Sequence, residues 1–207
     1  MNEEFSIRSE EELDSLFGEP NALVKGKSRD SLDDSMMEFI RRSPLVCIST
    51  VDNTGKLDVS PKGDSPGFIQ IDDSGNLLIP DRPGNRLVLG FRNILQNNNV
   101  GLLFVVPTMK ETLRVKGRAT LSTDPLLLQS LSAQGKPALL CTHIEVEECF
   151  FHCGKAMIRS HMWKSEKWIK HTDSLMVLHV AKKMDADAGT VKAIEAEIER
   201  NYREELY

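Results

Sequence analysis

The sequence predicts a mainly β protein of the α+β class, in which helices flank a barrel-like sheet. Short apolar segments follow one another at close spacing in the middle of the chain, separated by polar turns. Several of these segments are rich in β-branched residues or alternate apolar with polar residues, as strands do. Amphipathic helical patterns lie before and after them. Strands at such spacing favour an antiparallel meander or barrel over a sheet built from βαβ units.

The chain length sets the domain organisation. A chain of 207 residues, 40% of them hydrophobic, is long enough to fill one core. We expect residues 1–207 to form a single domain. Within it, 1–43 is expected to be a helical N-terminal extension, 44–165 the barrel core, and 166–207 a pair of C-terminal helices.

The N-terminal extension contains two helical patterns. Ser9 and the glutamates that follow it fit a capping box, and Gly18 ends that short helix. A second helix is expected over 31–42. It ends before Pro44, because the residue that precedes a proline avoids the helical region.

The remaining elements follow from periodicity and turn residues. Strands are expected over 45–51, 56–61, 68–71, 76–80, 100–106, 112–121 and, for the most part, 137–151. Helices are expected over 86–96, after Asp124, and over 173–184 and 187–203, with a helix or turn over 155–163. Segment 112–121 alternates apolar with cationic side chains, and Gly117 interrupts that pattern.

The overall charge excludes some classes of partner. The net charge is −5 and the pI is about 5.6, whereas a general nucleic-acid binder needs a basic face. No apolar run approaches the ~18 residues of a membrane-spanning helix. The acidic N-terminus lacks the apolar region of a secretory signal. We therefore expect a cytoplasmic protein with no nucleic-acid or membrane partner and with reduced cysteines.

A group of cations stands out in this acidic chain. Its members are Lys62, Arg82, Arg86, Arg114, Lys116 and Arg118. Single cations on a sheet are often no more than a solvated face. Several of these, however, lie at strand ends or in a loop where Pro83 and Gly84 can turn backbone N–H groups toward an anion. Because Arg and Lys pair well with phosphate, the group favours a small phosphorylated ligand.

A second group of residues has the side chains of metal ligands. It comprises Cys141, His143, Cys149, His152, Cys153 and His161. The spacing does not form the two matched pairs of a zinc site, and the first members alternate with apolar residues, as half-buried strand residues do. We predict no metal here. Thiol catalysis by Cys153 beside His152 is a less favoured alternative.

Several segments in this order resemble the pyridoxamine 5′-phosphate oxidase-like flavoproteins. They read LDVSPKGDSPGF, LLIPDRPGNR, VGLLFVVP, ETLRVKGRA and CFFHCGKAMIRSHMW. The resemblance covers about residues 30–165, and PDRPGNR and the HC-x-KA-x-x-RS segment are its specific parts. The chain is most similar to a bacterial FMN-dependent branch, and the closing pattern at 202–207 also looks like that branch. The resemblance implies an FMN-binding split β-barrel that forms a homodimer, with FMN at the subunit interface.

The resemblance also implies the residues that contact the cofactor. Candidates for the flavin phosphate are Lys62, Arg82, Asn85 and Arg86. Backbone groups of Val59, Ser60, Ile79 and Pro80 are expected to line the isoalloxazine and ribityl. Thr112 and Arg114 are expected to approach from the partner subunit, and Arg159 and Trp163 to close the cleft from the C-terminal side.

Three functions are compatible with these expectations. The leading one is an FMN-dependent oxidoreductase, in which a reduced nicotinamide or a small organic substrate delivers hydride to the flavin. The alternative is a non-catalytic split barrel that binds FMN or haem for sensing or storage. Oxidation of vitamin B6 phosphates is the third, and the chain lacks the C-terminal arginine signature of the true oxidases.

Overall fold

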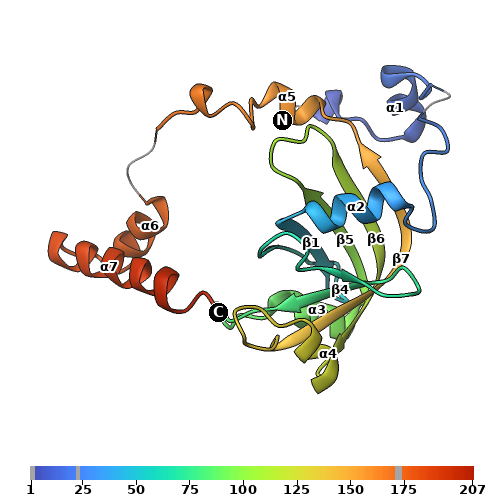
Figure 1. Ribbon diagram of the computed structural model, residues 1–207. Coiled ribbons are helices and arrows are strands. Elements are labelled where there is room, and N and C mark those ends of the chain that lie inside the picture. Colours follow the sequence, from blue (N-terminus) through green and yellow to red (C-terminus); the bar gives the residue numbers. More distant parts are fainter. Residues whose placement is uncertain (1–2, 22–23, 171–173) are drawn as a thin grey trace.

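In the computed structural model, which describes residues 3–21, 24–170 and 174–207, the core is an antiparallel sheet (Figure 1). Its strands in the described residues are β1 (Leu45–Val51), β2 (Leu57–Gly63), β3 (Gln70–Ile71), β4 (Leu77–Asp81), β5 (Asn99–Val105), β6 (Thr112–Ser122) and β7 (Leu140–His152). Their order across the sheet is β2-β1-β5-β6-β7-β4-β3. The predicted α+β split barrel is confirmed.

Helices precede and follow the strands along the chain. They are η1 (Glu3–Phe5), α1 (Glu10–Phe17), α2 (Asp34–Arg42), α3 (Leu89–Gln96), α4 (Pro125–Ser130), α5 (Lys155–Arg159), η2 (Ser165–Lys167), α6 (Leu175–Lys183) and α7 (Ala188–Glu204). Of these, α3 and α4 lie between strands. The predicted helix over 173–184 is α6, and its first predicted residue lies outside the described residues.

The sheet curls until its two edge regions approach each other. β2 lies at one edge and β4 lies next to the opposite edge, so the two strands are not neighbours in the sheet. Nevertheless, Lys62 Nζ on β2 lies 2.6 Å from Asp81 Oδ1 on β4. This ion pair crosses the split of the barrel. The space between β2 and β4 is therefore the candidate place for a ligand to bind.

β6 shows how the sequence pattern builds the core. Leu113, Val115 and Ala119 are buried, whereas the cationic residues between them are exposed, as the alternation predicts. At Gly117 the pairing register with β7 shifts. A Cβ atom at that position would lie 2.0 Å from the Glu145 carbonyl oxygen, so only glycine allows β7 to approach this closely.

α2 packs its apolar face on the sheet. Asp33 caps the helix by accepting a hydrogen bond of 2.9 Å from the Met36 amide. Met36, Phe39 and Ile40 are buried, and the Phe39 ring meets Phe151 edge-on with ring centroids 5.4 Å apart. α2 therefore covers the apolar interior of the curled sheet.

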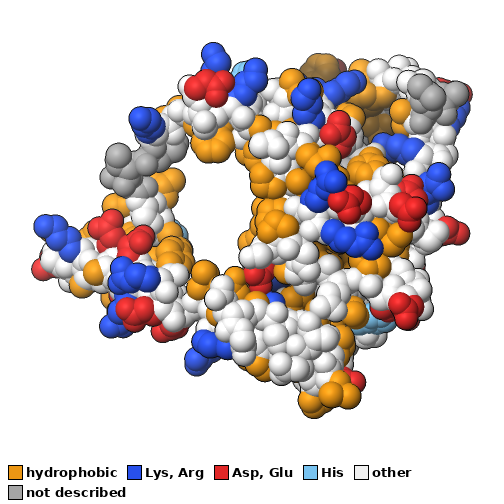
Figure 2. All heavy atoms as spheres, in the orientation of Figure 1, with side chains coloured by type: hydrophobic (Ala, Val, Ile, Leu, Met, Phe, Trp, Pro, Cys, Tyr) orange, Lys and Arg blue, Asp and Glu red, His pale blue; other side chains and the backbone are white. Residues whose placement is uncertain are grey.

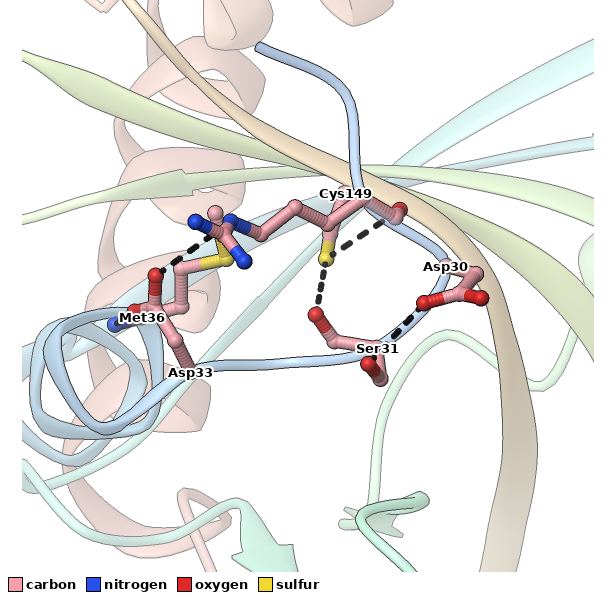
Figure 3. Close-up of polar contacts among 6 residues, drawn as sticks. Asp30, Ser31, Asp33, Met36 and Cys149 are labelled. Carbon is pink, nitrogen blue, oxygen red and sulfur yellow. Dashed lines mark hydrogen bonds and ion pairs between the residues drawn. The ribbon is translucent and has the colours of Figure 1, made fainter. Parts of the chain in front are cut away.

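The segment before α2 is joined to β7 (Figure 3). The backbones of Arg29 and Cys149 exchange two hydrogen bonds, of 3.0 and 2.8 Å. The Cys149 thiol donates to the Ser31 carbonyl at 3.2 Å, and burial raises its pKa. Cys149 is thus a buried residue that holds the N-terminal segment on the barrel.

The predicted helix over 86–96 begins later than expected, at Leu89. Arg86 and Val88 have φ values of 61° and 49°, which lie in the left-handed region, so the helix cannot extend back through them. Residues 82–88 instead form a loop at the open end of the split, and this loop contains three of the four predicted phosphate ligands, Arg82, Asn85 and Arg86.

The chain beyond β7 forms a C-terminal arm, which we define as residues 154–207. α6 packs on α7, and the two helices stand apart from the sheet (Figure 1). Figure 2 shows an opening between the arm and the barrel, with hydrophobic side chains around its rim. The predicted division of the chain at residues 43 and 165 stays a prediction. Within the described residues, no helix has both the length and the apolar character to cross a membrane.

Candidate cofactor-binding site

A cavity of about 770 Å³ lies at the split between β2 and β4. Side chains of β2 alternate about the sheet, so Ser60 and Lys62 are half-buried on the cavity side, whereas Val59 is 65% exposed on the other face. Ile79 and Pro80 of β4 are buried beneath the cavity. The cavity therefore has an apolar floor and a cation at the end of β2.

The loop over 82–88 forms the outer wall of this cavity. Arg82, Asn85 and Arg86 all line it. Asn85 Oδ1 accepts a hydrogen bond of 3.0 Å from the Leu87 amide, which holds the turn. Arg86 is exposed and, among the described residues, has no hydrogen-bond or ion-pair partner. Its guanidinium is therefore available to an anion.

The two other cations of the cavity are already paired with carboxylates. Lys62 contacts Asp81 and also lies 4.7 Å from the centre of the Phe91 ring. Arg82 Nε donates to Asp64 Oδ2 at 3.0 Å, with only 15% and 5% of the two side chains exposed. An Arg has five N–H donors, so this bond leaves the terminal nitrogens of Arg82 for a ligand.

Asp64 is the most buried charged group of the site. Burial raises the pKa of its carboxyl, but hydrogen bonds from the Tyr207 hydroxyl, the Ser65 amide and Arg82 outweigh that effect, and the pKa is lowered. Asp64 therefore remains ionised at neutral pH and holds the Arg82 guanidinium in place.

Eight of the predicted cofactor residues surround this one cavity. They are Val59, Ser60, Lys62, Ile79, Pro80, Arg82, Asn85 and Arg86. Thr112 and Arg114 instead line a second cavity, of about 820 Å³, on the outer face of β1, β2, β5 and β6. Thr50 and Val59 line both cavities, so the two adjoin at β1 and β2.

Arg159 and Trp163 lie on the C-terminal arm and line neither cavity. Trp163 Nε1 donates to the Met109 carbonyl at 2.6 Å, which fastens the start of the arm to the turn between β5 and β6. In this single chain the two residues are thus separated from the split, and their assignment to the cofactor stays a prediction.

The structure also places residues at the cavity that sequence reasoning did not select. Asp64, Asp81, Phe91, Thr142 and Tyr207 all line it. Asp81 lies within the PDRPGNR motif, which was a usable signal. Tyr207 lies in the C-terminal pattern 202–207, but nothing local to that pattern indicates that it meets Asp64, 143 residues earlier in the chain.

The cysteines and histidines are dispersed. Among the described residues, no group of three or more His, Cys, Asp or Glu side chains is placed to hold a metal ion. His143 Nε2 lies 3.3 Å from Asp72 Oδ2. Cys141 is fully buried, and burial raises the pKa of its thiol to about 11. Cys153 is exposed.

Comparison with known proteins gives one family. The model of the family described as pyridoxamine 5′-phosphate oxidase matches residues 32–153, which include the sheet from β1 to β7 and the candidate cavity loop. No curated protein matches the chain.

Solved structures with a similar fold have low sequence identity. HupZ from Group A Streptococcus is 18% identical, with 58% of this chain and 93% of that chain covered and a TM-score of 0.47. General Stress Protein 26 from Bacillus anthracis is 17% identical, with 55% and 88% covered and a TM-score of 0.43. HutZ, a haem storage protein from Vibrio cholerae, is 16% identical, with 58% and 94% covered and a TM-score of 0.38. At these values the similarities carry no argument about a ligand.

Proposed function

This chain belongs to the pyridoxamine 5′-phosphate oxidase family, and from that premise we propose that it is an FMN-binding flavoprotein and an oxidoreductase for a small-molecule substrate. One observation supports the proposal most strongly. Eight residues that the sequence predicts to contact a flavin line a single cavity at the split of the barrel, and Lys62, Arg82 and Arg86 are among them.

The cavity fits a flavin nucleotide in size and chemistry. Its volume of about 770 Å³ lies in the range of ~300–1,000 Å³ typical of cofactor pockets. Ile79 and Pro80 offer an apolar surface to a ring system, and the free nitrogens of Arg82 and Arg86 offer donors to a phosphate. The Asp64 carboxylate holds Arg82 and the Asp81 carboxylate holds Lys62, so these two cations keep defined places beside the cavity.

The residues of this chain have the roles of binding and orientation. The arginines of the 82–88 loop and Lys62 hold the phosphate end, and the backbone of β2 and β4 meets the rest of the cofactor. The apolar floor excludes water from one side of the ring. A bound flavin supplies the redox chemistry itself, with a reduced nicotinamide or small organic molecule as electron donor.

We further propose that two copies complete the site as a homodimer. The outer face of the sheet contains exposed apolar side chains, with Leu57 73% and Leu103 37% exposed, around the cavity that Thr112 and Arg114 line. Burying this face against a second copy would cover those side chains. It would also bring Thr112 and Arg114 of the partner subunit toward the split.

Flavin binding tests the cofactor assignment. We expect the purified protein to take up FMN, measured by quenching of flavin fluorescence. The double variant Arg82→Ala, Arg86→Ala is expected to weaken binding about a hundredfold or more. Each charge-assisted bond to phosphate is worth about 1.5–3 kcal/mol, and about 1.4 kcal/mol corresponds to a tenfold change in affinity.

The matched control is Arg41→Ala, Arg42→Ala, which removes the same charge from exposed positions on α2. It is expected to bind FMN as the unmodified protein does. Equal affinity in the two double variants would remove the phosphate assignment. A protein that takes up haem and no FMN would favour the haem-binding alternative.

Reduction of the bound flavin tests the oxidoreductase assignment. We expect anaerobic addition of NADH or NADPH, or of an organic donor, to bleach the flavin absorption of the complex. A complex that retains FMN but that no such donor reduces would favour a binding or sensing protein.

A further inference from the structure

The chain ends in contact with the candidate cofactor cavity. After α7 the arm returns to the barrel beside β4 (Figure 1). Leu206 and Tyr207 line the cavity at the split. The Tyr207 carbonyl accepts a hydrogen bond of 2.7 Å from Lys136 Nζ, which fixes its backbone to the loop that precedes β7.

The Tyr207 side chain reaches the buried carboxylate of the site. Its hydroxyl donates to Asp64 Oδ1 at 2.7 Å. The same oxygen accepts the Ser65 amide at 2.7 Å, and the other oxygen, Oδ2, accepts Arg82 Nε at 3.0 Å. Asp64 is therefore held from both sides, and its orientation depends on Tyr207 as well as on its own loop.

This arrangement determines where Arg82 faces. Only 5% of the Asp64 side chain is exposed, so water cannot easily replace a lost partner. With Nε bound to Asp64, the terminal nitrogens of Arg82 have no hydrogen-bond partner among the described residues and are free to bind an anion. Losing the Tyr207 hydroxyl would let the Asp64 carboxylate rotate, and the guanidinium would turn with it.

We propose that Tyr207 is a positioning residue of the cofactor site, which acts through Asp64 to orient Arg82 toward the phosphate of the bound cofactor. The proposal rests on the proposed function and extends it to the C-terminal arm. The end of the arm thereby becomes part of the binding site, although it lies outside the family match over residues 32–153. The hydrogen bond between Tyr207 and Asp64 therefore couples retention of the cofactor to the position of the arm.

A double-mutant cycle separates positioning from a general structural role. The variants are Tyr207→Phe, Asp64→Ala and the two combined, and FMN affinity is the readout. We expect Tyr207→Phe to weaken FMN binding about 3- to 10-fold in the unmodified protein and to have no further effect in the Asp64→Ala background. Tyr202→Phe is the matched control, because Tyr202 lies exposed on α7. The FMN affinity of this variant is expected to equal that of the unmodified protein.

A second readout needs no cofactor. The chain has two tyrosines, so ultraviolet titration of the tyrosinates resolves both. The hydrogen bond to Asp64 raises the pKa of Tyr207 above its ordinary value. We expect one of the two tyrosines to titrate late, to be lost in Tyr207→Phe, and to return toward its ordinary pKa in Asp64→Ala.

Two results would overturn the proposal while leaving the proposed function intact. One is an FMN affinity that Tyr207→Phe does not change. The other is an equal loss in both backgrounds, which would mean that the phenol acts on folding and not through Asp64. If the unmodified protein bound no FMN, the proposed function would fail together with this inference, so the two failures are distinguishable.

Discussion

Single residues in this chain have roles that their neighbours in sequence do not reveal. Gly117 allows β6 and β7 to approach at the register shift, and Asp64 joins Arg82 to the end of the chain. In both cases the constraint is a contact with a residue far away in the sequence. The chemistry of the residue type matters, since only glycine lacks a Cβ and the Asp64 carboxylate accepts hydrogen bonds on both of its oxygens.

The close approach at Gly117 gives a prediction about stability. Gly117→Ala would place a Cβ 2.0 Å from the Glu145 carbonyl oxygen and 3.0 Å from Ile144 Cγ2, so the strands must separate. We expect the free energy of unfolding to fall by about 2–4 kcal/mol, measured by urea denaturation.

The matched control is Gly101→Ala on β5, where an added Cβ meets nothing within 4 Å. That variant is expected to be neutral or more stable by up to about 1 kcal/mol. Equal stability of the two variants would show that β7 can move away at no cost, and the role given to Gly117 would then be wrong.

At the scale of elements, capping contacts and backbone conformation decide where helices begin. α2 begins after Asp33, whose side chain accepts the Met36 amide, and α3 begins only after two residues in the left-handed region. The late start of α3 is important for function, because it leaves residues 82–88 as a loop whose cations face the split. A helix that began at Arg86 would point that side chain elsewhere.

The cap of α2 gives a second prediction. Asp33→Ala removes the side chain that satisfies the Met36 amide, and the free energy of unfolding is expected to fall by about 1 kcal/mol. Asp34→Ala, at the first helical residue, keeps that cap and is expected to change stability by less than about 0.5 kcal/mol. Thermal or urea unfolding would measure both. If Asp34→Ala were the more harmful of the two, the helix would not depend on this cap.

At the scale of the whole molecule, the curled sheet leaves two kinds of surface. The split between β2 and β4 combines charged and polar groups with an apolar floor, and the outer face combines exposed apolar side chains with cations of β6. The rim of the opening beneath the arm is largely apolar (Figure 2). Exposed apolar side chains on the arm include Trp168, Ile169 and Leu175. A surface of this kind is expected to be covered by another protein molecule.

The proposed homodimer gives a prediction about mass in solution. We expect the unmodified protein to have the mass of two chains by light scattering. Leu103→Arg, on the outer face of β5, is expected to give a monomer with weakened FMN binding, because Thr112 and Arg114 of the partner subunit are then missing.

Leu126→Arg is the matched control, since Leu126 is 84% exposed on α4 and lines neither cavity. It is expected to remain a dimer. A monomeric mass for the unmodified protein with FMN still bound would contradict the proposed shared site.

Local sequence patterns predicted most of the strands and helices and the residue types of the candidate cofactor site. Alternation along 112–121 identified both faces of β6, and PDRPGNR identified the loop with Arg82 and Arg86. These features are local, since side-chain periodicity and turn chemistry depend on residues close together in the chain. The family resemblance rested on the same local segments.

Which of these residues meet depends on the folded structure. It brought Lys62 to Asp81 across the split, and Tyr207 to Asp64 across 143 residues, and it left Arg159 and Trp163 away from the cavity. Such contacts depend on how far the sheet curls and on where the arm returns. Both are set by packing over the whole molecule, which no local pattern in the sequence encodes.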